Sequence, residues 1–217
     1  MVTPIPASAL FSTAGLSRET LRCGIAGIDQ HLTGLPRGAI TELTGSPSSG
    51  RSSAVAAIIS KSISLFEYCV YIDGSNVLDA VAWRAAGVDF SRLLWVRSNH
   101  NLDAALKAAD LILHAGGFGL VCLDLAGFSP GLVCRIPIAW WYRFRRAIEN
   151  TPAVLVVLAD HPLARNCASV WLRFERPQAV FSGRRGGRLF RGFRVRSVIE
   201  KPGRPREVRF SAVAVCG

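Results

Sequence analysis

The chain has 217 residues, which is enough for one domain with a substantial hydrophobic core. Half of the residues are hydrophobic, but no run of about 18 residues is free of charges and helix breakers, so we expect no membrane-spanning helix. The formal charge of +11 is carried almost entirely by arginine. Such a charge favours an acidic partner, most often nucleic acid, although a solvated basic surface has the same composition.

The N-terminal residues and the cysteines indicate the compartment. The first 16 residues lack a basic start and contain Pro4 and Pro6, so they do not resemble a signal peptide. The cysteines form no C-x-x-C pair and have no histidine pairs beside them; they are Cys23, Cys69, Cys122, Cys134, Cys167 and Cys216. We therefore expect reduced thiols in the cytoplasm and no metal site built from cysteine and histidine.

Residues 1–20 are rich in Pro, Ala, Ser and Thr and are expected to form a loosely ordered arm, with residues 21–217 forming one core domain. Ile25, Ile28 and Leu32 recur at helical spacing. Residues 35–38, Leu-Pro-Arg-Gly, are typical of a turn that leads into the next strand.

A strand, a glycine-bounded loop and a helix are predicted over residues 39–61. The loop sequence 45–52, GSPSSGRS, has the spacing of a phosphate-binding P-loop, G-x-x-x-x-G-K-[ST], except that Arg51 stands where the lysine is expected. Glycines permit inward-facing N–H groups, and the helix start offers free donors to an anion. The predicted nucleotide-binding residues are Gly45, Ser46, Ser48, Ser49, Gly50, Arg51, Ser52, Ser53 and Asp124. Alternatively, the two glycines are present only because the turn itself requires them.

Strands and helices then alternate. Apolar runs at 69–72, 93–96, 120–123 and 153–159 predict strands, the first and third of which end at Asp73 and Asp124. Segments 77–86, 102–114 and 135–149 predict helices, with Pro137 in the first turn of the last. Apolar strands alternating with helices predict an α/β fold with a mainly parallel central sheet flanked by helices.

The C-terminal part differs in character. Strands are predicted at 169–174, 193–199 and 207–214, with a hairpin turn at 202–205, so antiparallel strands are expected to extend the parallel sheet. Between Arg165 and Arg209, thirteen basic residues face three acidic ones and leave +10 of the chain's charge. Residues 182–193 are expected to form a flexible Arg/Gly loop that carries aromatic residues. The candidate contacts to nucleic acid or to an acidic partner are Arg184, Arg185, Arg188, Arg191 and Arg194.

Two features carry open alternatives. The segment 119–124 has the form of a strand ending in a magnesium-binding aspartate, so Ser52 and Asp124 are the candidate Mg²⁺ ligands if nucleotide binds; a lone aspartate in that position also serves as a turn cap. The helix 135–149 carries Trp140, Trp141 and Tyr142 among arginines, which is typical of a protein interface if exposed and of a core if not.

Three segments together carry a family resemblance: residues 27–53, residues 70–98 and the LVCLDL run at 120–125. They resemble the core of RecA-type recombinases, with a RecA-like P-loop fold over roughly residues 22–215. Within that superfamily the likeness is greatest to the ImuA family of RecA-like accessory proteins in bacterial translesion synthesis, on residues 87–94, 170–173 and 199–205.

The resemblance implies a damaged catalytic site. The family's catalytic glutamate lies two residues after the aspartate matched by Asp73, and here that position is Ser75. The lysine is Arg51, and the polar Asn-Gln pair that senses the γ-phosphate is Asp160-His161. The loss of the general base alone removes roughly 10²–10⁴-fold of rate. The expectation is therefore feeble or absent ATPase activity, with ATP and Mg²⁺ bound weakly if at all.

The resemblance also implies partners. The leading hypothesis is an adaptor in the SOS response that links RecA, an ImuB-like Y-family polymerase homologue and an error-prone replicative-type polymerase, with single-stranded DNA as a further ligand, in the bacterial cytoplasm at the nucleoid. One alternative is an ATP-dependent RecA-like repair enzyme that uses a relocated carboxylate, Glu42 or Asp79. Another is a regulator that binds RecA without contacting DNA.

Overall fold

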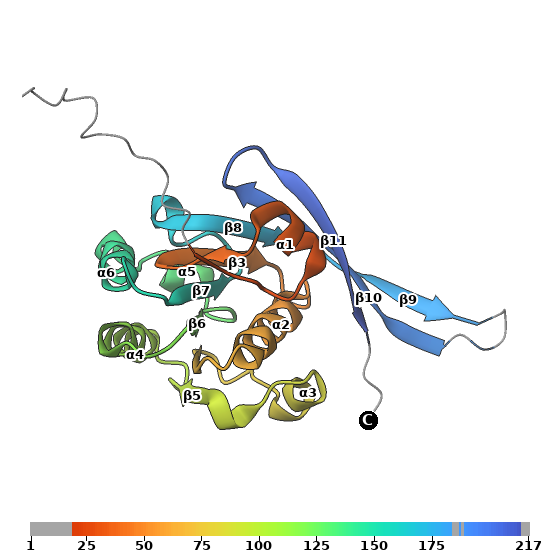
Figure 1. Cartoon of the computed structure of the whole chain (residues 1–217), viewed down its shortest axis with the longest axis horizontal. Helices are drawn as coiled ribbons and strands as arrows, with labels where there is room; N and C mark the ends of the chain where they lie inside the picture. Colours follow the sequence, from red (N-terminus) through yellow and green to blue (C-terminus); the bar gives the residue numbers. More distant parts are fainter. Residues whose placement is uncertain (1–18, 184–186, 188, 214–217) are drawn as a thin grey trace, which may run out of the picture.

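The computed structural model describes residues 19–183, 187 and 189–213. It shows a nine-stranded sheet with helices on both faces and a separate two-stranded ribbon near the N-terminal end of the described chain (Figure 1). The helices are α1 Ala26–Leu32, α2 Arg51–Ser64, α3 Ala80–Ala85, α4 Leu102–Ala115, α5 Pro130–Val133 and α6 Ile138–Ile148. The strands are β1 Thr20–Leu21, β2 Leu35–Pro36, β3 Ala39–Gly45, β4 Cys69–Asp73, β5 Leu93–Arg97, β6 Leu120–Asp124, β7 Val154–Ala159, β8 Ala168–Phe174, β9 Gln178–Ser182, β10 Leu189–Lys201 and β11 Arg206–Val213.

The large sheet has the order β11-β10-β8-β3-β7-β6-β4-β5, and β9 pairs with β10. The pairs from β8 through β5 are parallel. The pairs of β10 with β8, β9 and β11 are antiparallel. The predicted α/β class, with a mainly parallel sheet extended by antiparallel C-terminal strands, is confirmed. Because parallel strands end at the same edge, the carboxyl ends of β3, β4, β6 and β7 lie together.

Two apolar cores cover the two faces of the sheet. On one face α1, α2 and α3 pack over residues such as Leu43 and Leu158, and on the other α4 and α6 pack over residues such as Ile40 and Leu155 (Figure 1). Every residue of β3 and β7 is buried, as expected for central strands covered on both faces. Within the described part of the chain, none of the helices combines the length and the apolar character needed to cross a bilayer.

Several predicted bounds change. Helix α3 begins at Ala80 rather than Val77, because Asp79 caps it in an extended conformation. The segment predicted as one helix over 135–149 begins only at Ile138, since Pro137 is its N-cap, and a short separate helix, α5, precedes it. Strand β9 was not predicted, and β10 begins at Leu189, so the part of the expected loop 182–193 from Leu189 onward belongs to a strand; residues 184–186 and 188 lie outside the described residues.

The chain ends of this fold are only partly described. Of the arm predicted over residues 1–20, residues 1–18 lie outside the described residues, and Thr20 pairs with Pro36 in the small ribbon. At the other end, β10 and β11 are joined across residues 202–205, which confirms the predicted hairpin turn. Strand β9 and the adjoining part of β10 extend away from the rest of the fold (Figure 1).

Candidate phosphate-binding loop and basic hairpin

The loop predicted to bind phosphate joins β3 to α2, as the sequence indicates. Gly50 has a φ of 94°, a conformation that disfavours other residues. A Cβ atom at Gly50 would lie 3.0 Å from the side chain of Val195, and one at Gly45 would lie 2.6 Å from the carbonyl oxygen of Phe174. The C-terminal strands therefore require both glycines for packing. Their presence is explained without a nucleotide.

The hydroxyl group of Ser49 lies inside this loop. Ser49 is 1% exposed, and its Oγ has no hydrogen-bond partner among the described residues. The Ser49 backbone N–H donates to the carbonyl oxygen of Ser46 at 3.2 Å, which closes the turn. A buried hydroxyl without a partner is unfavourable unless a ligand or water satisfies it. The loop therefore retains an unused hydrogen-bonding group.

Arg51, at the position of the expected lysine, is held by the end of β7. Its Nη1 atom lies 2.8 Å from Oδ1 of Asp160 and donates a hydrogen bond to the carbonyl oxygen of Ala159. No hydrogen bond from a described residue reaches that Asp160 oxygen with the usual angles. The Arg51–Asp160 contact is thus a charge–charge pair, with the N–H of Arg51 directed at Ala159. Since Arg51 is only 7% exposed, its charge is compensated inside the protein.

Asp73 and Asp124 are in register at the ends of neighbouring strands. Oδ1 of Asp124 accepts from the Ala126 N–H at 2.8 Å, and Oδ2 accepts from the Tyr71 hydroxyl. Asp73 accepts from the N–H groups of Val77 and Leu78, at 3.0 and 3.2 Å, and from Trp95 Nε1 at 3.3 Å. Each carboxylate oxygen of the pair therefore already serves the fold.

Burial has a large effect on Asp124. Desolvation is the main reason that its pKa is raised from 3.8 to about 6, while the hydrogen bond from Tyr71 and the charge of Arg51 act in the opposite direction. The pKa of the Tyr71 hydroxyl is raised as well, first by burial and then by the Asp124 charge.

These contacts test whether magnesium fits. Mg²⁺ requires near-ideal octahedral oxygen coordination and usually uses one or two carboxylates with free lone pairs. Here Asp124 is only 2% exposed beneath Tyr71 and Ala126, and its neighbour Asp73 accepts hydrogen bonds from three donors. Because the Asp124 carboxylate is buried, the residues as arranged do not present it to a magnesium ion held with Ser52.

Ser75, which stands at the position of the catalytic glutamate, also has its side chain engaged within the fold. The hydroxyl group of Ser75 donates to the carbonyl oxygen of Ala126 at 2.7 Å, and Ser75 is buried. Of the carboxylates considered as replacements, Glu42 is 1% exposed and accepts from the N–H groups of Leu163 and Ala164. Asp79 accepts from two N–H groups at the start of α3. Both carboxylates therefore already accept hydrogen bonds from backbone N–H groups.

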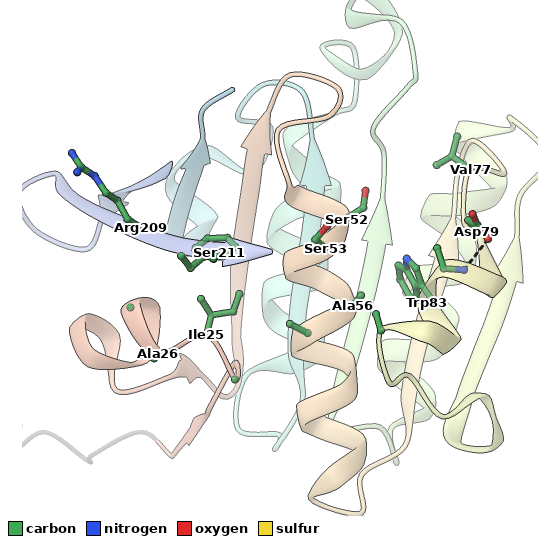
Figure 2. A pocket seen from close by; sticks show the side chains of 16 residues that line it. Ile25, Ala26, Ser52, Ser53, Ala56, Val77, Asp79, Trp83, Arg209 and Ser211 are labelled. Atoms are coloured by element: carbon green, nitrogen blue, oxygen red, sulfur yellow. Dashed lines mark hydrogen bonds between the residues drawn. The ribbon is translucent and has the colours of Figure 1, made fainter. Parts of the chain in front are cut away.

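Two cavities meet at the first turn of α2. One, of about 760 Å³, is lined by the loop and by Arg176, Ala179, Phe193 and Val195 from the C-terminal part. The other, of about 820 Å³, lies over α2 between α1 with β11 on one side and α3 on the other (Figure 2). Ser52 and Ser53 line both cavities, and Figure 2 shows them at the end of α2 with Trp83 and Asp79 across the gap. The predicted loop residues thus border a space large enough for a small ligand.

The basic C-terminal strands present a row of aromatic rings. Phe181 on β9 lies opposite Phe190 on β10 with ring centroids 5.6 Å apart, and Phe190 is 5.0 Å from Phe193. Phe181 and Phe193 are about half exposed. The sequence shows aromatic residues here but does not predict their alignment, because β9 has no clear alternating pattern.

The candidate arginines are only partly described. Arg191 and Arg194 lie on β10 and are exposed, and Arg191 donates to the Ser182 hydroxyl at 2.7 Å. Arg184, Arg185 and Arg188 lie outside the described residues. The two described arginines therefore belong to a strand and not to a flexible loop.

The aromatic residues of α6 are mainly core. Trp141 and Phe144 are buried, and Trp140 packs on Phe144 with ring centroids 5.6 Å apart. Tyr142 is exposed, while Arg143 on the same helix pairs with Asp110 of α4. The core alternative therefore holds for Trp141, and Tyr142 is left on the surface.

Comparisons with known proteins agree with this geometry. The sequence model of the RecA N-terminal domain family matches residues 10–132, which include the loop, Ser75 and Asp124. The chain is similar to Protein RecA of Haemophilus ducreyi, with 32% identity over 124 residues, and to Protein RecA of Deinococcus radiodurans, with 34% identity over 120 residues. These matches cover 56% and 55% of this chain but 33% and 31% of the relatives, so the chain spans about a third of the length of the curated relatives it matches. Strands β7 to β11 lie beyond the family match.

Proposed function

The chain belongs to the RecA family, and we propose that it acts as a RecA-fold adaptor in DNA-damage tolerance that turns over little or no ATP. The likeness to the ImuA family supports a role in SOS mutagenesis and translesion synthesis. In that role the protein links RecA, an ImuB-like Y-family polymerase homologue and an error-prone replicative-type polymerase.

One observation carries the proposal: the groups that would act on a triphosphate are bound to each other or to the backbone. Arg51 is paired with Asp160, and Asp124 is hydrogen-bonded by Tyr71 and Ala126. Catalysis of phosphoryl transfer depends on positioning and on charges directed at the reacting phosphate. Charges compensated inside the protein do not supply that stabilisation.

The alternative to an adaptor is an enzyme, namely an ATP-dependent repair protein. In its favour, the two cavities that meet at Ser52 and Ser53 offer space for a nucleotide. Against it, Ser75 has no base function near neutral pH, and Glu42 and Asp79 already bind backbone N–H groups. The adaptor is therefore the better-supported function.

Basic strands supply the proposed contact with DNA. Arg191 and Arg194 are exposed on the strand that also carries Phe190 and Phe193, and basic residues together with aromatic rings suit single-stranded nucleic acid. A regulator that binds RecA without contacting DNA would not need these arginines and phenylalanine rings.

Steady-state phosphate release with Mg²⁺ and single-stranded DNA tests the proposal, with an active RecA as the reference. We expect a rate at least roughly 100-fold below the reference, because the general base is missing. A DNA-stimulated rate within tenfold of RecA would refute it. Co-purification of the protein with RecA and with a polymerase after DNA damage tests the adaptor role directly, and loss of both interactions would exclude that role.

A further inference from the structure

The end of β7 brings an acid to the cation of the phosphate-binding loop. Strands β3 and β7 are parallel neighbours, with Thr44 opposite Ala159. The residue after β7 is Asp160, and the loop after β3 returns to α2 at Arg51. Since both connections leave the same edge of the sheet, Arg51 and Asp160 meet, with Nη1 and Oδ1 2.8 Å apart.

The charges around Arg51 are balanced without any ligand. Arg51 is 7% exposed, and the side chain of Asp160 is 26% exposed. Asp124 is also close enough for the Arg51 charge to lower its pKa. A buried cation needs such compensation, because an isolated charge away from water is costly. The approach of a polyphosphate would add negative charge next to two carboxyl groups.

The loop nevertheless keeps the shape and donors of an anion site. Ser49 is 1% exposed and its hydroxyl has no partner among the described residues. The loop precedes α2, a helix of 14 residues whose free N–H groups and dipole favour an anion. A cavity of about 760 Å³ borders Ser46 to Ser53. Of the groups that would bind an anion here, the Arg51 guanidinium already has an anionic partner, Asp160.

We propose that Asp160 is the resident anion of this loop: its carboxylate takes the place of a phosphate beside Arg51, holds the loop in shape without a nucleotide, and keeps nucleoside di- and triphosphates out. The inference rests on the proposed function, in which the site does not hydrolyse ATP. It goes further in naming the residue that prevents binding and the class of ligand that is excluded.

The change Asp160→Asn tests this inference, because it removes the negative charge and keeps the size of the side chain. We expect the variant to bind ATP at least tenfold more tightly than the wild type in calorimetric titrations with EDTA present, since Arg51 becomes available to phosphate. We also expect inorganic pyrophosphate to raise the thermal unfolding temperature of the variant and not that of the wild type.

Two further variants complete the design. Asp103→Asn removes a carboxylate from an exposed ion pair with Lys107 on α4 and should leave ATP affinity at the wild-type level. Arg51→Met with Asp160→Asn removes both charges, should fold as well as the wild type, and should lose the gained affinity.

Equal ATP affinity of the folded wild type and Asp160→Asn would overturn the inference. If Asp160→Asn does not fold alone, the double variant provides the test. If Asp160 is needed for folding only because it neutralises Arg51, the variant that lacks both charges should fold. Its failure to fold would also overturn the inference. Rapid phosphate release by the wild type would instead refute the proposed function, so the two failures are distinguishable.

Discussion

The carboxyl group of Asp124 is almost fully buried at the end of β6, where Tyr71 and Ala126 donate hydrogen bonds to it. Its pKa is raised to about 6, mainly by burial. The folded state therefore holds a proton on Asp124 between about pH 4 and pH 6 that the unfolded state has already released. Stability from this group is consequently present below pH 4 and is lost as the pH rises through 6.

The change Asp124→Asn should remove this pH dependence, because asparagine stays neutral. The difference in pKa corresponds to roughly 3 kcal/mol, so we expect the unfolding free energy of the variant, relative to that of the wild type, to rise by up to about this amount between pH 4 and pH 7. Urea unfolding at both pH values measures it. Two curves that stay parallel across this range would show that Asp124 is ionised at an ordinary pKa.

At this scale the sequence predicts which side chains come together only where they end strands. Asp73 and Asp124 close two apolar runs, and parallel pairing brings them into register. The contact between Arg51 and Asp160 depends instead on the direction of a long side chain. The contact between Tyr71 and Asp124 depends on the inward orientation of a side chain on the neighbouring strand. Neither leaves a local signal, so neither was predicted.

Among the elements, helix α6 shows how one amphipathic segment divides its aromatic residues. Trp141 and Phe144 are buried against the sheet with ring centroids 5.9 Å apart, and Ile148 continues the same face. Tyr142 is 53% exposed on the adjacent position. Neighbouring helical residues are about 100° apart, so the side chain of Trp141 faces the core while that of Tyr142 faces solvent.

We expect Trp141→Ala to lower the free energy of unfolding by about 3–5 kcal/mol, because it leaves a cavity between α6 and the sheet. Tyr142→Ala on the same helix is the matched control and should change it by less than about 0.5 kcal/mol. Chemical denaturation monitored by far-UV circular dichroism provides both values. Comparable losses for the two variants would mean that Tyr142 is packed and the helix is rotated from its position here.

The more deeply an element is buried, the more accurately its position was predicted from the sequence. The parallel strands are continuous apolar runs, and their positions were predicted to within a residue or two. Strand β9 was missed because most of its residues are exposed and it pairs only with β10. The start of α6 was misplaced because Pro137 also suits a first helical turn, and only the preceding turn of α5 makes it the N-cap.

Over the whole molecule, the positive charge is less available than its total suggests. The three glutamates of the C-terminal part, Glu175, Glu200 and Glu207, form ion pairs with Arg173, Arg196 and Arg209. Among the described arginines of the C-terminal part, five are exposed and have no such ion pair: Arg176, Arg191, Arg194, Arg204 and Arg206. Arg176, Arg191 and Arg194 lie just before β9 and in the first half of β10, and Arg204 and Arg206 lie at the turn into β11.

The phenylalanine row lies on the same strands. Phe181, Phe190 and Phe193 are in edge contact, and Phe193 also lines the cavity at the phosphate-binding loop. Exposed rings and unpaired arginines on the same strand allow bases to stack while phosphates are neutralised. This surface, Phe181 to Phe193 with Arg191 and Arg194, is the part of the described chain best suited to single-stranded DNA.

We expect Phe181→Ala to weaken binding of a fluorescent oligo-dT strand by about 5- to 150-fold, because stacking of one base on an aromatic ring contributes roughly 1–3 kcal/mol. Replacing Arg191 and Arg194 by glutamine should weaken binding and also reduce the slope of log K against log salt by about 1.4, because two phosphate contacts are lost. Phe66→Ala is the matched control: Phe66 is 79% exposed and stacked by Arg92, but it lies between α2 and β4, so DNA binding should not change. Anisotropy titrations over a salt series separate the two effects, since a ring contributes affinity without a salt dependence. Wild-type protein that fails to bind the strand at low salt would remove DNA from the list of ligands and favour a regulator that acts through RecA alone.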